Sequence, residues 1–580
     1  MPFRDPTTIG RVRHVLGSTV TVELDSALAG VTPLWRGRPV PIGQVGSLVR
    51  LPQGPVTLLA SVTLVGISEL TAPPPPALAP EQGDRWLQVQ LLGEVDALGK
   101  FRRGVATYPG LDDTVHFVTA EDIAAAYPPP NEHRVKVGVV SSNPDVPVAV
   151  DLASFVARHS AIVGSTGSGK SSTVASILQS VVDQGWRSAN LVVIDPHGEY
   201  ASAFGANASV RSVFGGAAKA LRIPFWALPP TDLLHLLTGI ETKTVLDRFS
   251  ELVIAERTRF ASKCAWIPNE LAIRIGTETP LPFDLRNVWY ALDRANRRTV
   301  VGNPASAEAL VAEGDAATLT PAEFQAYGAG GSPPNKGVTF GVYSPAVDRL
   351  RARLTDPTYA FLLSPPDTAA ADPLPATVAE WLGGTSPISI LDFSGVPSEV
   401  ADVAIGVTLQ ILLEVSTRSD LRDAIGRGRP TLIVLEEAHR YLADTRTTSR
   451  ARASVNRIAR EGRKYGLGMC LVSQRPSELP DTALSQCGTI VALRLTNSTD
   501  QATVRSALPD TVSGLAAILP SLRTGEALVS GESIALPTRA AIRRPAPEPH
   551  AADPELGGWR ADPKLMPDVS GAIVRWREGI

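Results

Sequence analysis

Alternating apolar and polar residues mark roughly the first 120 positions of the chain. The stretches 11–24 and 47–51 have this period of two and are bounded by Gly, Pro and Asp residues. Evenly spaced short strands without helical periodicity are typical of a small barrel or a sandwich. We therefore predict an all-β unit over residues 1–125. The proline-rich tract 72–80 is predicted to be a loop or rigid spacer, because proline cannot occupy a central strand.

From about residue 135 the pattern changes to short apolar runs, each followed by a polar or Gly-containing turn and often by a helical stretch. Parallel strands that are covered on both faces have this appearance, so we predict a doubly wound α/β domain over residues 135–542. Val403, Val407, Ile411 and Val415 recur every four residues and predict the buried stripe of a crossover helix. The predicted strands are 161–163, 191–194, 388–391, 432–435, 469–472 and 490–493.

Nearly 200 residues separate the second and third predicted strands, which is too many for one crossover. Helical periodicity in this region predicts a helical insertion over about 231–335. Within it, 305–336 is rich in Ala, Gly and Pro and is expected to have little regular structure. The proline-rich and polar segment 543–580 is either a frayed tail or an arm that ties subunits together.

Composition and charge exclude several classes of protein. The formal net charge is −3, so the chain does not coat nucleic acid by bulk positive charge, although a local basic lining remains possible. Three scattered cysteines are too few for a disulfide framework or a four-cysteine zinc site. We find no signal peptide and expect no membrane-spanning run, and therefore expect a cytoplasmic protein.

The strongest candidate chemistry is a P-loop directly after the strand at 161–163. Its glycines allow backbone N–H groups to wrap phosphates, and the following helix adds the positive end of its dipole. Lys170 is expected to reach the β- and γ-phosphates of ATP, and Ser171 to ligate Mg²⁺. The predicted nucleotide-binding residues are Gly164, Ser165, Thr166, Gly167, Ser168, Gly169, Lys170, Ser171 and Ser172.

A pair of carboxylates ends the strand at 432–435. NTP hydrolysis needs one acidic group on the metal and one on the attacking water. We assign Glu436 to Mg²⁺, largely through water, and Glu437 to the nucleophile. A solvated Glu-Glu turn is the alternative interpretation, and the presence of a P-loop in the same domain makes it the weaker one. His439 either couples nucleotide state to a neighbouring subunit or merely caps the turn.

Two further strands end in polar residues that belong at the same edge of the sheet. Asp195 and Glu199 follow the strand at 191–194 and are expected at the border of the nucleotide, because ligands bind outside the carboxyl ends of such strands. A role of Asp195 in the turn itself is the alternative. Gln474 follows the strand at 469–472 and is expected to sense the γ-phosphate.

A basic stretch precedes that last strand. On a helix, Arg457, Arg460, and Arg463 with Lys464 lie along one face. Such a face is often simply solvated. In an oligomeric ATPase it has two sharper uses, as an arginine finger on a neighbour's γ-phosphate or as contacts to DNA phosphates.

With these residues in view, the chain resembles the HerA family of hexameric DNA-translocating ATPases. The motifs that carry the resemblance occur in the order GSTGSGKSS, VIDPHGEY, IPFWAL, LEEAHRY, RIAREGRKYG and SQRPSELP. The resemblance implies a RecA-like P-loop ATPase core behind a HAS-type N-terminal β-barrel. It also implies a homo-hexamer around duplex DNA, with ATP between subunits, Arg460 or Arg463 as the finger in trans, and 543–580 as a brace. The pair Glu436-Glu437 departs from the Asp-Glu of many relatives but retains both carboxylates.

HerA-like proteins work with partners, so the resemblance also implies an effector docked on the barrel. The candidates are a NurA-like nuclease in DNA end processing, and a sirtuin-type NADase or another defence enzyme against phage. We therefore expect an ATP-driven motor for duplex DNA. The alternatives are a ring scaffold that licenses a partner enzyme without substantial translocation, and a related pump for single strands or polypeptide.

Overall fold

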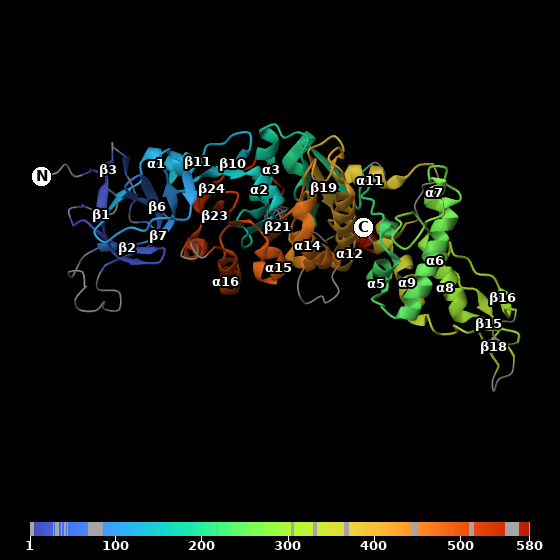
Figure 1. Ribbon diagram of the computed structural model, residues 1–580. Coiled ribbons are helices and arrows are strands. Elements are labelled where there is room, and N and C mark those ends of the chain that lie inside the picture. The colour runs from blue at the N-terminus through green and yellow to red at the C-terminus, as the bar shows by residue number, and fades with distance from the viewer. Residues whose placement is uncertain are drawn as a thin grey trace.

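The chain forms an elongated molecule with a β-barrel at one end, a large sheet in the middle and a group of helices at the other end (Figure 1). The predicted loop at 72–80 lies outside the part of the chain that the structure describes, as do residues 551–567 of the C-terminal segment. The computed structural model describes residues 5–26, 28, 34–35, 38–39, 42, 44–67, 85–216, 219–302, 307–328, 333–364, 370–442, 450–509, 515–550 and 568–578.

Six N-terminal strands close into a barrel, which resolves the choice between a barrel and a sandwich. Their order around it is β2 (Thr19–Leu24), β1 (Thr8–Leu16), β9 (Thr114–Phe117), β5 (Leu48–Gln53), β6 (Val56–Ile67) and β7 (Arg85–Val95). Strand β7 pairs back with β2, and β8 (Phe101–Arg103) is added beside β7. Alternate residues such as Val20 and Val22 fill the interior, as the period of two requires.

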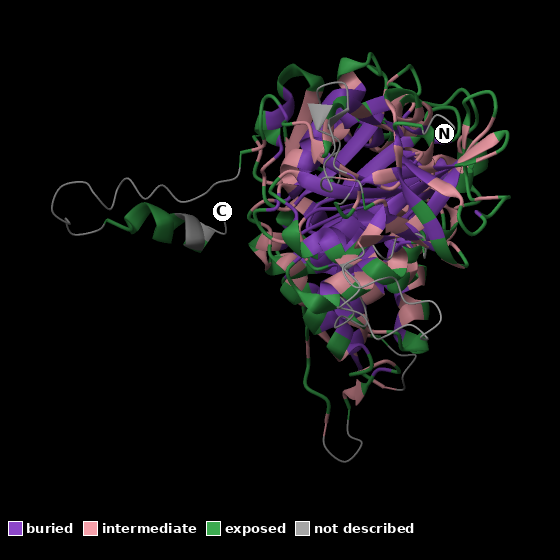
Figure 2. Cartoon of the chain, turned by 90° about the vertical axis from the view of Figure 1, so that its left-hand side faces the viewer, coloured by how far each residue is buried: buried purple, intermediate pink, exposed green. Residues whose placement is uncertain are grey.

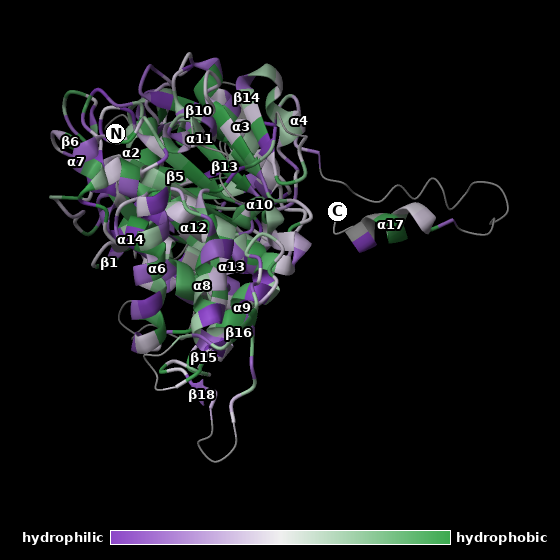
Figure 3. Cartoon of the chain, turned by 90° about the vertical axis from the view of Figure 1, so that its right-hand side faces the viewer, coloured by the Kyte–Doolittle hydropathy of each residue, from purple (hydrophilic) through white to green (hydrophobic). Residues whose placement is uncertain are grey.

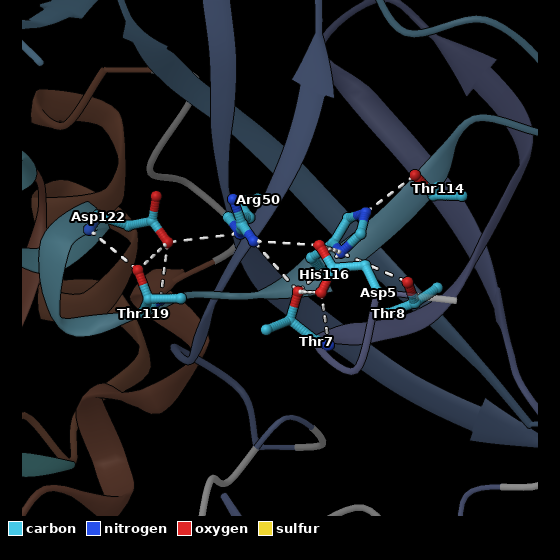
Figure 4. A network of polar contacts seen from close by, with 8 residues as sticks. All are labelled: Asp5, Thr7, Thr8, Arg50, Thr114, His116, Thr119 and Asp122. Atoms are coloured by element: carbon cyan, nitrogen blue, oxygen red, sulfur yellow. Dashed lines mark hydrogen bonds and ion pairs between the residues drawn. The ribbon is translucent and has the colours of Figure 1, made fainter. Parts of the chain in front are cut away.

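A polar network fastens the N-terminus of the barrel to helix α1 (Ala120–Ala126) (Figure 4). The hydroxyl of Thr7 lies 2.9 Å from Nδ1 of His116 and accepts a hydrogen bond from Arg50 at 3.1 Å. Arg50 also pairs with Asp122, which forms the capping box of α1 with Thr119. Burial lowers the pKa of His116, so this imidazole is neutral at neutral pH and holds strands together by hydrogen bonding.

An 11-stranded sheet forms the central domain. All neighbouring pairs from β22 to β14 are parallel, and the four strands from β11 to β23 are antiparallel. All six predicted strands are present, as β12, β13, β19, β20, β21 and β22, which confirms the α/β core. The order across the sheet is β11 (Asn143–Asp151), β10 (Arg134–Val140), β24 (Thr538–Ile542), β23 (Glu526–Gly531), β22 (Thr489–Ala492), β12 (Ser160–Val163), β21 (Leu467–Ser473), β20 (Thr431–Leu435), β13 (Asn190–Asp195), β19 (Ile388–Asp392) and β14 (Ala208–Ser212).

Helices cover both faces of this sheet, so its strands are buried and apolar (Figures 2 and 3). In β13, Leu191 and Val193 join the core beneath helix α3, whereas Val192 and Ile194 join the core beneath α12. The helices around the sheet are α2 (Leu152–Ala157), α3 (Lys170–Asp183), α4 (Ala201–Phe204), α12 (Ser398–Arg418), α13 (His439–Leu442), α14 (Arg450–Glu461), α15 (Asp481–Ser485) and α16 (Ser498–Ala507).

Helix α12 carries the predicted stripe, with Val403, Val407 and Ile411 buried. It is also the one helix among the described residues that is long and apolar enough to cross a membrane, although we expected no such segment. The structure places 78% of its apolar window inside the protein. Its hydropathy therefore reflects a helix in contact with the sheet on one side and with further helices on the other.

The segment between β14 and β19 is helical, but its helices extend beyond the predicted limit at residue 335. The later helices belong to the same unit, because Trp289 of α8 donates a hydrogen bond to the carbonyl of Val347 in α9 at 3.1 Å. Two short antiparallel ladders, β15 with β18 and β16 with β17, involve residues of the segment 305–336, where we expected little regular structure. The elements are α5 (Pro230–Thr238), α6 (Lys243–Ala261), α7 (Asn269–Ala272), α8 (Leu285–Arg297), β15 (Thr299–Val300), β16 (Leu310–Ala312), β17 (Glu323–Phe324), β18 (Asn335–Lys336), α9 (Ser344–Thr355), α10 (Ala360–Leu363) and α11 (Pro373–Trp381).

A buried arginine attaches this helical unit to the motif IPFWAL. Arg257 of α6 is 0% exposed and donates hydrogen bonds to the carbonyls of Trp226, Leu228, Gly276 and Thr277. Burial lowers its pKa to about 10, which leaves it charged at neutral pH. The motif therefore has a structural function here, since its backbone receives the arginine's hydrogen bonds.

Candidate active site

The P-loop lies between β12 and α3, in the middle of the 11-stranded sheet. Gly167 and Gly169 adopt left-handed backbone conformations, with φ of 70° and 100°, which glycine accepts without strain. The hydroxyl of Ser168 donates to the carbonyl of Ser165 at 2.7 Å, so it stabilises the loop from within. Residue Gly164 donates to the carbonyl of Ser473 at 3.2 Å, which ties the loop to strand β21.

The two residues that open α3 point to the centre of the site. Lys170 is buried, and its ammonium lies 3.5 Å from the carbonyl of Ser165. Ser171 donates a hydrogen bond from its hydroxyl to Oε2 of Glu199 at 2.9 Å. The predicted lysine and metal-binding serine are therefore adjacent to a carboxylate that arrives from the neighbouring β13 turn.

Both carboxylates after β20 are buried, at 2% exposed for Glu436 and 9% for Glu437. Tyr200 donates its hydroxyl proton to Oε2 of Glu436 at 2.7 Å, and burial raises the pKa of this carboxyl to about 8. The solvated-turn alternative thus disagrees with their burial. At neutral pH the Glu436 carboxyl is predominantly protonated in this state, because burial makes its charged form unfavourable.

Glu437 has a strained backbone, with φ of 46° in a non-glycine residue. Its Oε2 lies 3.2 Å from Nδ1 of His439, but the pair does not have hydrogen-bond geometry, and this oxygen has no donor among the described residues. Burial lowers the pKa of His439, whose Nδ1 also lies 3.3 Å from the hydroxyl of Ser473. Strain of order 1–3 kcal/mol is retained mainly where a side chain must be aimed at a site.

Asp195 organises a turn. One carboxylate oxygen accepts the backbone N–H groups of His197 and Gly198, at 3.1 and 2.8 Å, and the other accepts that of Tyr200 at 3.0 Å. Burial raises its pKa while these hydrogen bonds oppose the shift. The geometry therefore favours the turn interpretation, and the turn in question carries Glu199 to Ser171.

Gln474 stands directly between the P-loop and the acidic pair. Strand β21 separates β12 from β20, so the residue that follows it reaches both edges. The Oε1 atom of Gln474 accepts a hydrogen bond from the hydroxyl of Thr166 at 2.6 Å. Its predicted position beside the phosphates is thus compatible with the observed contact.

The basic stretch divides into two groups instead of forming one helical face. Helix α14 ends at Glu461, and Arg463 and Lys464 lie in the following 3₁₀ turn, where a side chain at Gly462 would meet the carbonyl of Leu467. Arg457 turns toward α12, where it donates to Glu414 at 2.7 Å.

Arg460, Arg463 and Lys464 instead line a pocket of about 860 Å³ with Arg103 and Arg158, which we call the basic pocket. Arg158 precedes β12 in the chain, so this pocket lies at the amino end of the strand whose carboxyl end carries the P-loop. Four residues of strand span about 13 Å. These arginines are therefore across the sheet from their own P-loop.

The oxygen-rich site fits a magnesium nucleotide. Mg²⁺ prefers oxygen ligands and is usually held by one or two carboxylates together with substrate phosphates. Ser171, Glu199 and Glu436 supply such oxygens. Within the described residues, no group of three His, Cys, Asp or Glu side chains that could hold a metal ion is found.

Two family models match this chain consecutively. "Helicase HerA, central domain" matches residues 135–412, and "Helicase HerA-like C-terminal" matches residues 412–545. Together they contain the P-loop, the acidic pair, Gln474 and the basic stretch. The chain belongs to the HerA helicase family. It is thus an ATPase of the DNA-translocating helicase class, as the motifs predicted.

Individual relatives agree with this assignment. The DNA double-strand break repair helicase HerA of Pyrococcus furiosus is 24% identical over 475 residues, covering 76% of this chain and 73% of the relative. The enzyme of the same name from Sulfolobus acidocaldarius is 34% identical over 170 residues, covering 29% of this chain and 34% of the relative.

Solved structures of two other proteins are similar at low identity. VirB4 of Thermoanaerobacter pseudethanolicus has a TM-score of 0.45 at 14% identity, covering 71% of this chain and 97% of that one. The plasmid coupling protein TrwB, in complex with a non-hydrolysable ATP analogue, has a TM-score of 0.43 at 15% identity, covering 74% and 93%.

Several residues at the nucleotide site and the basic pocket were not predicted from the sequence to have a role. Tyr200 contacts Glu436, and its position in VIDPHGEY next to Glu199 was the available signal. Arg440 lies 3.0 Å from Nε2 of His197 at the edge of the site. Arg158 and Arg103 had no local signal, because they come from separate elements that only the fold brings to the basic pocket.

Proposed function

We propose that this chain assembles into a ring of six that hydrolyses ATP to move duplex DNA. The observation that carries the proposal is the location of two complementary sites on opposite edges of one sheet. The anion-binding P-loop lies at the carboxyl edge, and the basic pocket lies at the amino edge. In a ring, the pocket of one subunit would face the nucleotide of the next.

Within each nucleotide site, the P-loop amides and Lys170 hold the phosphates, while Ser171 and Glu436 hold Mg²⁺. When bound, the ion screens the phosphate charge and the charge that develops on the leaving group. Glu437 orients and polarises the attacking water. Its buried Oε2, which has no donor among the described residues, supports this role. Gln474 senses the γ-phosphate through its hydrogen bond with Thr166 of the P-loop.

The finger in trans comes from the basic pocket. Arg460 and Arg463 cannot reach their own P-loop across the sheet, and neither pairs with a carboxylate in the part of the chain that the structure describes. Unpaired guanidinium groups are available for a γ-phosphate supplied by a neighbour. Arg457 is less suited to this role because Glu414 already neutralises it.

We further propose that the motor acts in DNA end processing with a nuclease or another effector that docks on the barrel. The relatives' names refer to double-strand break repair. The barrel also has a direct connection to the ATPase, because Arg103 of β8 donates to the carbonyls of Gly531 and Ala535 beside the basic pocket. An antiphage role with an NADase partner uses the same docking surface.

The deciding experiment measures the ATPase rate with and without linear duplex DNA. Light scattering of the same protein, as it elutes from a size-exclusion column, gives the oligomeric state. A hexamer stimulated severalfold by duplex would support the motor. A hexamer that is indifferent to DNA would contradict it and favour the ring scaffold. Glu437→Gln separates the two further, because a scaffold should activate its partner even when turnover is blocked.

A further inference from the structure

The segment after the last strand of the sheet is fastened to the helix that follows the P-loop. We call residues 543–550 the strap. Gln179 of α3 is 8% exposed, and its amide oxygen accepts the N–H of Ala546 at 2.9 Å. Its amide nitrogen donates to the carbonyls of Pro547 and Ala203, both at 2.8 Å. Two of the three hydrogen bonds of this buried amide therefore hold the strap, and the third fixes the amide to Ala203 of α4.

The end of the strap reaches the turn that carries Glu199. The N–H of His550 donates to the backbone carbonyl of Glu199 at 2.9 Å, and Ser202 donates to the carbonyl of Glu548 at 3.2 Å. The carboxylate of the same Glu199 accepts the hydroxyl proton of Ser171. Glu199 thus contacts the strap through its backbone and the P-loop helix through its side chain.

We propose that Glu199 is a positioning residue of the nucleotide site and that the docked strap sets its position. The proposal rests on the proposed nucleotide site. Asp195 holds the turn from one side and His550 from the other, so loss of the strap frees the Glu199 backbone. Ser171 then loses the acceptor of its hydroxyl proton, and with it the hydrogen bond that leaves the oxygen lone pairs of this hydroxyl directed to Mg²⁺. Because coupling is reciprocal, a nucleotide that uses Ser171 stabilises the docked strap.

This arrangement also refines the expected C-terminal brace. Residues 543–550 are held on their own subunit, with Arg543 paired to Asp183 at 3.0 Å. His550, the last residue of the strap, lies beside the Glu199 turn of its own subunit. Helix α17 (Ser570–Glu578) lies apart from the body of the molecule, as Figures 2 and 3 show. A brace that follows His550 would therefore begin beside the turn that connects Glu199 to the P-loop helix.

Hydrogen exchange of the full chain tests the coupling without any variant. The probes are Mg·ADP and a fluorescent ATP analogue with Mg²⁺. We expect either nucleotide to slow exchange of the His550 amide by about fivefold or more, which is the lower end of common coupling effects. Exchange at His550 that is unchanged by a nucleotide that binds would overturn the proposal.

A matched pair of substitutions tests it from the strap side. Gln179→Leu should speed exchange across the strap and weaken binding of the analogue about fivefold or more. Gln184→Leu lies at the end of the same helix, where its amide contacts the carbonyl of Arg134, and should change neither. Equal affinities of the two variants would contradict the coupling.

A double-mutant cycle places the connection at Glu199. In a Glu199→Ala background, Gln179→Leu should still loosen the strap but cause no further loss of affinity, since the connection is already broken. A further fivefold loss would show a route that bypasses Glu199. Failure of the proposed function would look different, because a chain that binds nucleotide but ignores DNA would leave these results unchanged.

Discussion

Replacing Tyr200 by phenylalanine tests whether Glu436 must ionise for catalysis. The Tyr200 hydroxyl donates to the Glu436 carboxylate at 2.7 Å inside the protein. Burial raises the pKa of Glu436 to about 8, and the hydrogen bond from Tyr200 opposes that rise. Phenylalanine retains the ring and removes the donor, so the pKa of Glu436 must increase further.

The size of the effect follows from the strength of that hydrogen bond. A hydrogen bond to a charged group contributes about 1.5–3 kcal/mol, and one pKa unit corresponds to about 1.4 kcal/mol. Tyr200→Phe should therefore raise the pKa of Glu436 by about 1–2 units. Because the ionised form is the one proposed to hold Mg²⁺, activity falls below this pKa, and the acidic limb moves to higher pH.

The assay is the pH dependence of kcat/KM for ATP, which reports ionisations of the free enzyme. The unmodified protein should lose kcat/KM as the pH drops below about 8. At pH 7 the variant should be roughly 10- to 100-fold slower than the unmodified protein, from the shift of 1–2 units. The difference should disappear as the pH is raised above both limbs.

Tyr441→Phe is the matched control. Tyr441 is also buried beside Glu436, but its hydroxyl donates to the backbone carbonyl of that residue at 3.0 Å and not to the carboxylate. Its removal should lower activity, if at all, equally at every pH. The reasoning is refuted if both variants have the same acidic limb as the unmodified protein, because Glu436 would then act without ionising.

Three further outcomes are expected. Lys170→Ala should abolish ATP binding in a fluorescence titration, and unchanged affinity would remove the P-loop assignment. The variants Arg460→Ala and Arg463→Ala should both bind ATP normally. The variant that removes the arginine finger should lose turnover by about 10³-fold or more. If both variants keep full turnover, the finger is another residue. Arg257→Met leaves four carbonyls without their donor, of which the buried pair at Trp226 and Leu228 cost about 1–3 kcal/mol each, so Tm should fall by several degrees in calorimetry while exposed Arg259→Met leaves it unchanged.

Local pattern was sufficient for the strands and for the nucleotide loop. Each of the six predicted parallel strands is a contiguous apolar run, and the P-loop and acidic pair follow such runs directly, so their meeting at one edge follows from strand direction. The seventh, β14, has the mixed sequence ASVRS and was not predicted. The hydrogen-bond acceptor of Ser171 was harder to predict from the sequence. Asp195 and Glu199 are both carboxylates, four residues apart, and only the turn's hydrogen bonds show that Asp195 holds the backbone while Glu199 faces the serine.

Sites assembled from separate elements were beyond the reach of sequence patterns. Helical periodicity placed Arg457 with Arg460 and Arg463, but the helix ends where Gly462 packs against Leu467, and this redirects the later residues. The helical unit likewise extends beyond residue 335 because α9 packs on α8, a contact between segments far apart in the chain. Neither event has a local signal, since both depend on tertiary packing.

In the proposed ring, the sheet would allow one subunit to serve two nucleotide sites. Strand β12 has the P-loop at its carboxyl end and Arg158 just before its amino end, and it lies between β21 and β22 in the buried core. A strand paired on both sides resists sliding, so a shift of the P-loop moves the edge of the basic pocket with it. Arg158 pairs with Glu532, and Arg103 of the barrel binds the turn that carries Glu532. A nucleotide bound at one edge is thereby mechanically connected to the basic pocket, which faces the neighbour in the proposed ring, and to the barrel through contacts within a single chain.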